Sequence, residues 1–211
     1  MSNTLTKPTP KGARTRDRIL DIAEASVLAK GFAATSIEEI IAEAEITKSG
    51  FFYHFRDKTQ LARALLQRFL QADDVLLDDL FARARELTDD PLHAYLVGFR
   101  LFAEAMEEME DVHPGCMVAA VAYQARQFDA EVRTLARDGM VNWRLRFREM
   151  LDAIAVKYPP HEEIDLDALA DQASVLVEGG IVLAKLFEDQ TLLAGQILLH
   201  RTFVKTLFSP R

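Results

Sequence analysis

The sequence predicts an all-α protein of about nine helices, and three observations support this fold class. Apolar residues recur at steps of three and four along most of the 211 residues, which is the spacing of one helix face. Capping residues and Pro or Gly breaks divide this pattern into helix-length pieces. No segment shows the convincing alternation of a β-strand. Because 49% of the residues are hydrophobic and 27% are charged, the chain has the composition of a globular protein.

The first four helices are expected within the amino-terminal third of the chain. Residues 1–14 lack apolar periodicity and are predicted to form a flexible basic arm. Gly31 suits the residue that follows a first helix, and Ser36 with Glu39 forms a capping box that starts a second. Thr47 and Asp57 can cap a third and a fourth helix. The expected ranges are 15–30, 37–44, 47–53 and 58–85.

Five more helices are expected in the rest of the chain. Pro91 suits the first turn of a helix, whereas Pro114-Gly115 and Tyr158-Pro159-Pro160 break the chain. Either Asp165 or Asp167 can cap the eighth helix. The expected ranges are 91–111, 116–126, 130–156, 165–187 and 191–208.

Charge is divided unevenly along the chain. Residues 1–70 carry 11 Lys and Arg against 8 Asp and Glu, whereas residues 71–211 carry 14 against 25. Such asymmetry favours a nucleic-acid-binding end joined to a second, acidic part. A non-specific DNA-binding protein is expected to be basic overall, so the net charge of −8 argues against that class.

Several other classes of protein and site are not expected. The longest apolar run, residues 116–123, is too short to span a membrane, and the amino-terminal segment has no signal-peptide pattern. We therefore expect a cytoplasmic protein without a membrane partner. Cys116 is the single cysteine, and His113 beside it makes a poor metal pair, so we expect neither a metal nor a cofactor.

The expected second and third helices are joined by about three residues near Glu45, which is the geometry of a helix-turn-helix. In that motif the second helix enters the DNA major groove. Around it, several spaced sequence elements resemble the DNA-binding domain of the tetracycline-repressor (TetR) family of bacterial transcriptional regulators. They are Arg18-Ile19-Leu20-Asp21-Ile22-Ala23, Lys30-Gly31-Phe32, Ala34-Thr35-Ser36-Ile37, Ile46-Thr47-Lys48-Ser49-Gly50, Tyr53-His54-Phe55 and Lys58. Two positions depart from the family pattern: Glu45 stands where Gly is usual, and Leu28 where an aromatic residue is more common.

The resemblance implies three parts: an arm over 1–14, a helix-turn-helix domain over 15–60 and an effector-binding and dimerisation domain over 61–211. A long fourth helix would join the last two. Phosphate contacts are expected from Thr35, Ser36, Lys48, Tyr53, His54 and Lys58, and base contacts from Thr47, Ser49, Gly50 and Phe52. Ser36 can instead be only a helix cap, and Tyr53 and His54 can instead pack against the first or fourth helix. We expect Phe51 and Phe55 in the small core of this domain.

In the resembled family the last two helices pair with those of a second copy, and the last two helices of this chain have unusually wide apolar faces. The expected interface residues are Leu169, Ala173, Leu176, Gly180, Leu183, Phe187, Leu193, Ile197 and Val204; the alternative is an ordinary core within one chain. Gly179 and Gly180 each cost a helix about 1 kcal/mol unless two backbones approach closely. A homodimer suits DNA recognition, because a protein with two-fold symmetry presents two recognition helices to a palindromic operator.

The fourth to eighth helices are expected to enclose a cavity for an apolar or aromatic effector. The candidate lining residues are Phe99, Phe102, Met106, Met109, Cys116, Met117, Tyr123, Phe128, Trp143 and Phe147, each of which can instead be core. Cys116 is either a reactive sensor thiol or, the preferred reading, a buried inert one.

The leading functional hypothesis is a DNA-binding regulator that represses from a palindromic double-stranded operator until an effector releases it, although activation is also found in the family. The contrasting hypothesis is a helical enzyme or small-molecule carrier that uses the acidic domain. The acidic run 104–111 lacks the Glu-x-x-His pair of a di-iron bundle, and no G-x-S-x-G nucleophile elbow is present. We therefore predict that the protein is not an enzyme.

Overall fold

The computed structural model describes residues 11–209, and within that range the chain is all-α, as the sequence predicts. The helices are α1 (Lys11–Lys30), α2 (Ile37–Glu43), α3 (Lys48–His54), α4 (Lys58–Leu87), α5 (Pro91–Glu107), α6 (Met117–Tyr123), α7 (Ala130–Lys157), α8 (Leu166–Phe187) and α9 (Thr191–Phe208), with a 3-10 turn, η1 (Ala125–Gln127), between α6 and α7. None of these helices is both long and apolar enough to cross a lipid bilayer.

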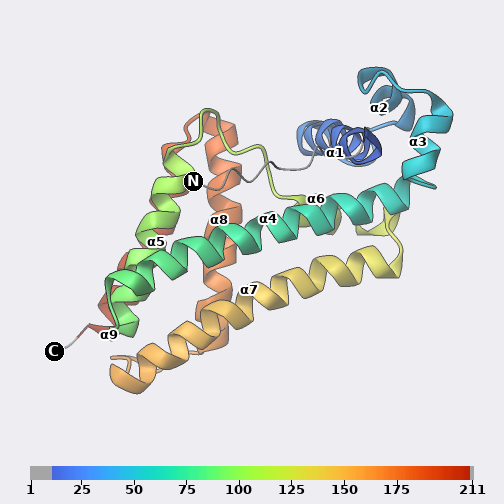
Figure 1. Ribbon diagram of the computed structural model, residues 1–211. Coiled ribbons are helices and arrows are strands. Elements are labelled where there is room, and N and C mark those ends of the chain that lie inside the picture. Colours follow the sequence, from blue (N-terminus) through green and yellow to red (C-terminus); the bar gives the residue numbers. More distant parts are fainter. Residues whose placement is uncertain (1–10, 210–211) are drawn as a thin grey trace, which may run out of the picture.

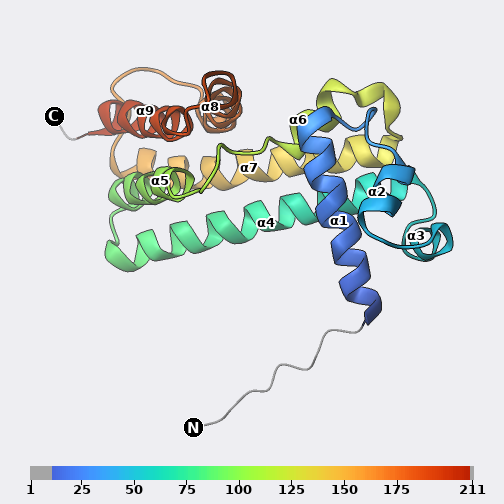
Figure 2. The same ribbon diagram turned by 90° about the horizontal axis from the view of Figure 1, so that it is seen from above.

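Figure 1 shows how two long helices set the shape of the molecule. α4 and α7 run side by side, and the head formed by α1, α2 and α3 lies at one end of this pair. Helices α5, α8 and α9 pack together toward the other end, and α6 lies between them and the head (Figure 2). The head and the α5, α8 and α9 group therefore lie toward opposite ends of α4, and Lys185 near the end of α8 reaches the Leu28 carbonyl of α1.

The expected helix caps are confirmed at each of the starts that they mark. Ser36 accepts from the backbone N–H of Glu39 at 3.1 Å, and the Glu39 carboxylate accepts from the N–H of Ser36 at 3.2 Å, which completes the capping box. The Asp57 carboxylate accepts from the N–H of Gln60 at 2.7 Å. Asp165, rather than Asp167, caps α8.

Three helix boundaries differ from the expected ones. α1 begins at Lys11 instead of residue 15, so residues 11–14 of the expected arm are helical; Lys, Ala and Arg form helices readily without an apolar face. Residues 1–10 of that arm lie outside the described residues. α5 ends at Glu107, because the acidic residues that follow are unfavourable near the negative end of a helix dipole. The expected helix 116–126 divides into α6 and η1.

Two hydrophobic clusters fill the interior. The first joins the head to α4, α6 and the start of α7: Phe51 and Phe55 of the head lie in the same cluster as Met117, Val121 and Phe128. The second lies among α4, α5, α7, α8 and α9 and contains a group of aromatic rings, including Phe81, Tyr95, Phe99 and Phe147. The head is thus packed against the rest of the chain rather than attached by α4 alone.

Candidate nucleic-acid interface and ligand cavity

The corner between α2 and α3 is formed by Glu45 in a left-handed conformation, with φ of 52°. A Gly adopts this conformation at little cost, whereas a side chain costs roughly 1–2 kcal/mol. The Arg18 guanidinium of α1 donates to the backbone carbonyl of Glu43 and to the Glu45 carboxylate, both at 3.3 Å. The turn therefore has the left-handed conformation at the position where the resembled family usually has Gly. The hydrogen bonds from Arg18 of α1 stabilise this conformation.

The amino-terminal end of α3 presents small polar side chains and one cation to solvent. The Thr47 hydroxyl accepts from the backbone N–H of Gly50 at 3.0 Å and lies 3.0 Å from the Ser49 hydroxyl. Thr47, Lys48 and Ser49 are exposed, and Gly50 is half-buried beside Thr47. Three side chains at this end of α3 are therefore open to solvent.

The next turn of α3 divides its aromatic residues between the core and the surface. Phe51 and Phe55 are fully buried, as expected, whereas Phe52 is 41% and Tyr53 is 83% exposed. Within residues 11–209 the one ring contact of Tyr53 is an edge contact with the His54 ring at 5.0 Å, and its high exposure does not fit packing on a neighbouring helix. His54 is half-buried and lies beside Gly12 at the start of α1, so the packing alternative applies to His54 and not to Tyr53.

Thr35, Ser36 and Lys58 are less available for phosphate contact than expected. Thr35 is 1% exposed, and its hydroxyl donates to the Gly31 carbonyl, so the expected contact from this side chain is wrong for this conformation. The Ser36 hydroxyl is engaged as the helix cap. The Lys58 amine donates to the Phe32 carbonyl at 2.6 Å and lies over the Phe32 ring, and burial lowers its pKa.

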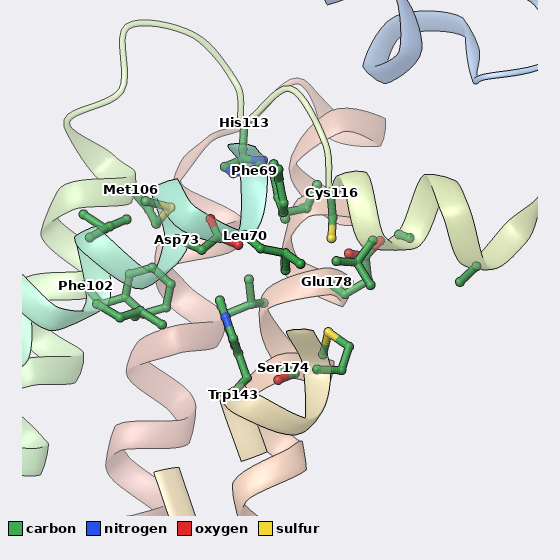
Figure 3. Close-up of a pocket in the computed structure, with 18 of the residues that line it drawn as sticks. Phe69, Leu70, Asp73, Phe102, Met106, His113, Cys116, Trp143, Ser174 and Glu178 are labelled. Carbon is green, nitrogen blue, oxygen red and sulfur yellow. The ribbon is translucent and has the colours of Figure 1, made fainter. Parts of the chain in front are cut away.

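A cavity of about 340 Å³ lies between α4, α5, α6, α7 and α8, where the sequence predicts one (Figure 3). Its walls include five of the expected lining residues, contributed by α5, the segment before α6, α6 and α7. These are Phe102, Met106, Cys116, Tyr123 and Trp143.

The other expected lining residues belong to the hydrophobic clusters instead. Phe99 and Phe147 are buried in the second cluster, Met117 and Phe128 in the first, and Met109 packs against the second. Their assignment to the cavity is therefore wrong. The apolar spacing of a helix marks residues that face inward, but the same spacing serves core packing and cavity lining alike.

The expectation that the cavity is apolar overlooked four polar residues that line it: Asp73 of α4, His113, and Ser174 and Glu178 of α8. Burial, with the nearby carboxylates of Asp74 and Glu24 as lesser causes, raises the pKa of Asp73 to about 7. A signal for Asp73 was present in the sequence, because it interrupts the apolar stripe that Phe69 and Leu76 mark on the fourth helix.

Cys116 has the properties of a protected thiol. Burial raises its pKa to about 12, and the Glu178 carboxylate acts in the same direction. Burial also lowers the pKa of His113, with the positive charge of Lys185 as the lesser cause. Since a thiol reacts as its thiolate, the inert alternative is favoured for Cys116. Within residues 11–209 no three His, Cys, Asp or Glu side chains gather into a set that could hold a metal ion.

Comparison with known proteins identifies the head. Residues 19–65 match the family described as bacterial regulatory proteins, tetR family. The DNA-binding head of this chain belongs to the TetR family. The chain is a DNA-binding transcriptional regulator, as the helix-turn-helix predicts.

Three relatives match this chain beyond the head. The transcriptional regulator AcuR of Cereibacter sphaeroides is 26% identical over 160 residues, which cover 74% of this chain and 70% of AcuR. The transcriptional repressor KstR2 of Mycobacterium tuberculosis is 30% identical over 98 residues, or 46% of each chain. The crystal structure of regulatory protein TetR from Rhodobacter sphaeroides has a TM-score of 0.72 at 22% identity and covers 92% of this chain and 98% of its own, which shows a shared fold.

Most of the expected dimer residues of this TetR-family chain are core residues of one protomer. The buried ones are Leu169, Ala173, Gly180, Leu193, Ile197 and Val204. A Cβ on Gly180 would lie 3.0 Å from the Leu193 Cα, so the expected close approach of backbones there is between α8 and α9 of the same chain. The assignment of these six buried residues to the interface is wrong. Of the three other expected interface residues, Leu176 is half-buried, and Leu183 and Phe187 are exposed.

A different apolar face remains open on α8 and α9. It is formed by the exposed residues Val175, Val182, Leu183, Leu186, Phe187, Leu199 and Phe203. On α8 these residues recur at helical spacing, so they form one stripe. Gly179 and Gly195 are exposed as well, and nothing lies within 4 Å of the Cβ that either would carry. We call this surface the α8–α9 face.

Proposed function

We propose that this TetR-family regulator binds a palindromic operator as a homodimer, represses transcription, and is released when a small molecule fills the cavity. The observation that carries the proposal is the solvent-facing side of α3, on which Lys48, Phe52 and Tyr53 are exposed. A helix of this kind enters the major groove, where a Phe can touch thymine methyl groups and a Lys or Tyr can meet a phosphate. Such a regulator would act in the cytoplasm, where its operator lies.

The α8–α9 face supports the homodimer. An exposed apolar surface of this breadth on a monomer marks an interaction site, and Gly179 and Gly195 leave room for a partner backbone. Repression is proposed because KstR2, one of the matched relatives, is named a repressor. The enzyme hypothesis is not favoured, because the matched relatives are named as regulators.

α4 supplies a route from the cavity to the head. Phe69 and Asp73 line the cavity, and Arg68, next to Phe69, binds Asp21 of α1 at 2.6 Å and Glu24 of α1 at 2.5 Å. A ligand that shifts this part of α4 would therefore move α1 and change the separation of the two reading helices. The ligand can release DNA only as far as its affinities for the two conformations differ.

The experiment that tests the proposal is selection of bound sequences from a random DNA pool, followed by band shifts of the selected operator across a salt series. Enrichment of one palindrome bound by a dimer is the expected result. A Lys48→Ala variant is expected to bind every sequence about tenfold more weakly. The salt slope, which is the slope of log affinity against log salt concentration, should fall in magnitude by about 2, because each of the two protomers loses one phosphate contact that contributes roughly 0.9.

Arg85→Ala is the matched control for Lys48→Ala, because it removes one exposed cation at the far end of α4. Its salt slope should equal that of the unmodified protein. An unchanged slope in Lys48→Ala would contradict the phosphate contact, and relaxed specificity at one operator position would assign Lys48 to a base instead.

A Leu186→Glu variant tests the homodimer. Leu186 is 73% exposed on the α8–α9 face, so the new carboxylate costs the monomer little but would be buried without a partner in the dimer. We expect the dimer dissociation constant, measured by sedimentation, to rise at least a hundredfold. The control is Val156→Glu, at an 88% exposed residue near the end of α7, which should leave dimerisation intact. Equal dissociation constants for the two variants would remove the α8–α9 face from the proposal.

A further inference from the structure

We infer that the cavity selects a cationic ligand with an aromatic or apolar body, and that the carboxylates of Asp73 and Glu178 hold its positive charge. This inference rests on the proposed effector function of the cavity and adds the chemical class of the ligand. It is carried by the arrangement of two acidic side chains in walls that are otherwise mostly apolar.

The walls are suited to the body of such a ligand. Phe69, Phe102 and Trp143 contribute aromatic rings, and Leu70 and Met106 contribute flexible apolar surface. A volume of about 340 Å³ is enough for one small molecule with a single ring. Aromatic faces also attract cations, so these walls favour a positive charge as well as an apolar body.

The two carboxyl groups that line the cavity belong to two different helices. Asp73 belongs to α4 and Glu178 to α8, and Figure 3 shows both side chains among the residues that line the space. Among the described residues neither forms an ion pair with a Lys or Arg. The neighbour of Glu178 is the Cys116 thiol, which is a weak and neutral donor.

Four acidic side chains elsewhere on the same helices are paired with arginines. Asp74 and Asp78 of α4 both bind Arg146 of α7. On α8, Asp167 binds Arg148 at 2.7 Å and Asp171 binds Arg144 at 2.5 Å. Within residues 11–209 an arginine thus binds each of these four acids, and none binds the two acids in the cavity.

The cations near the cavity do not replace the missing partner. His113 is kept neutral by burial, which lowers its pKa. The Lys185 amine is engaged by backbone carbonyls, at 2.8 Å from Pro114 and 3.4 Å from Leu28. A ligand cation would therefore meet two acceptors without having to displace a protein cation.

The electrostatic state of Asp73 agrees with this arrangement. Its raised pKa means that a charged carboxylate is unfavourable there while the cavity holds no cation, and the neighbouring negative charges of Asp74 and Glu24 add to this. A bound cation would reverse the effect, whereas an anionic ligand would be repelled. Charge, more than shape, should therefore decide which small molecules bind.

The fluorescence of Trp143 measures binding directly, because it is the single tryptophan of the chain and lines the cavity. We would titrate the full-length protein with three probes that share a phenyl ring and a short tether: phenethylamine (cation), 2-phenylethanol (neutral) and phenylacetate (anion). Phenethylamine is expected to bind at least tenfold more tightly than 2-phenylethanol, and phenylacetate more weakly than both.

Asp73→Asn and Glu178→Gln keep the size of each side chain and remove its charge. Each is expected to weaken phenethylamine binding about tenfold and to change 2-phenylethanol binding less than threefold. Asp79→Asn, on the exposed side of α4, is the matched control and should change neither. Circular dichroism of each variant checks that it folds.

The inference is overturned if 2-phenylethanol or phenylacetate binds as tightly as phenethylamine, or if phenethylamine leaves Trp143 unchanged up to millimolar concentration. Band shifts with the selected operator separate this failure from failure of the proposed function. Release of the operator by the neutral or anionic probe would contradict the proposed ligand class but leave the proposed regulatory function standing. A protein that binds no operator would contradict the proposed regulator, while the Trp143 titration would still decide the charge preference.

Discussion

Replacing Phe51 by alanine is expected to unfold the DNA-binding head and abolish operator binding. Phe51 is fully buried, and its ring packs against that of Phe55 at 5.9 Å between centroids. Removal of a buried Phe side chain costs about 3–5 kcal/mol, from lost burial and from the cavity that remains. Phe51 lies in the cluster that joins the head to α4, α6 and α7, so this loss loosens α1, α2 and α3 from the rest of the chain first. Hydrogen exchange of their amides and band shifts of the operator provide the measurement.

Phe52→Ala is the matched control, because it changes the same residue type at the next position. Phe52 is 41% exposed, so its loss should change the free energy of unfolding by less than about 1 kcal/mol. Its amide exchange should match that of the unmodified protein, while operator affinity falls if the ring touches thymine methyl groups. Equal exchange rates in the two variants would contradict the division of the α3 aromatics between core and DNA.

The helices of this protein could be predicted from the sequence because their boundaries are set locally. Ser36, Thr47, Asp57 and Asp90 each cap a helix by accepting a hydrogen bond from the backbone N–H three residues ahead. The helix-turn-helix followed from the same signals. The end of α5 was misplaced because the apolar spacing extends past the point where acidic residues oppose the helix dipole.

The cavity and the dimer face could be predicted only in part, because both depend on which inward side chains meet a neighbour. Phe99 and Phe102 are both apolar and one turn apart on α5, yet Phe102 lines the cavity and Phe99 does not. The wide apolar face of α8 was recognised, but the intrachain contact of Gly180 with Leu193 depends on the path of α9. Tertiary packing decides these assignments, and the spacing of apolar residues in the sequence carries no information about that packing.

Gly98 is another residue whose role depends on tertiary packing, because nothing in its sequence context marks it as important. The substitution Gly98→Ala is expected to have the second largest effect on stability. A Cβ at Gly98 of α5 would lie 2.3 Å from the Phe81 ring of α4. That ring cannot turn aside easily, because it also contacts the rings of Tyr95, Phe99 and Phe147. Overpacking a core costs about 1–3 kcal/mol or more, while the gain in helix propensity from Gly to Ala returns about 1 kcal/mol.

We expect a net loss of about 2 kcal/mol for Gly98→Ala, which lowers the melting temperature by roughly 6 °C at a fixed protein concentration. Phe81→Leu supplies a double-mutant cycle, because the smaller side chain makes room for the new methyl group. The Phe81→Leu substitution should cost less in the Gly98→Ala background than alone, with a coupling of at least 1 kcal/mol. Strict additivity would mean that α4 and α5 can separate freely at this crossing. The aromatic cluster would then not fix the spacing of these two cavity-lining helices.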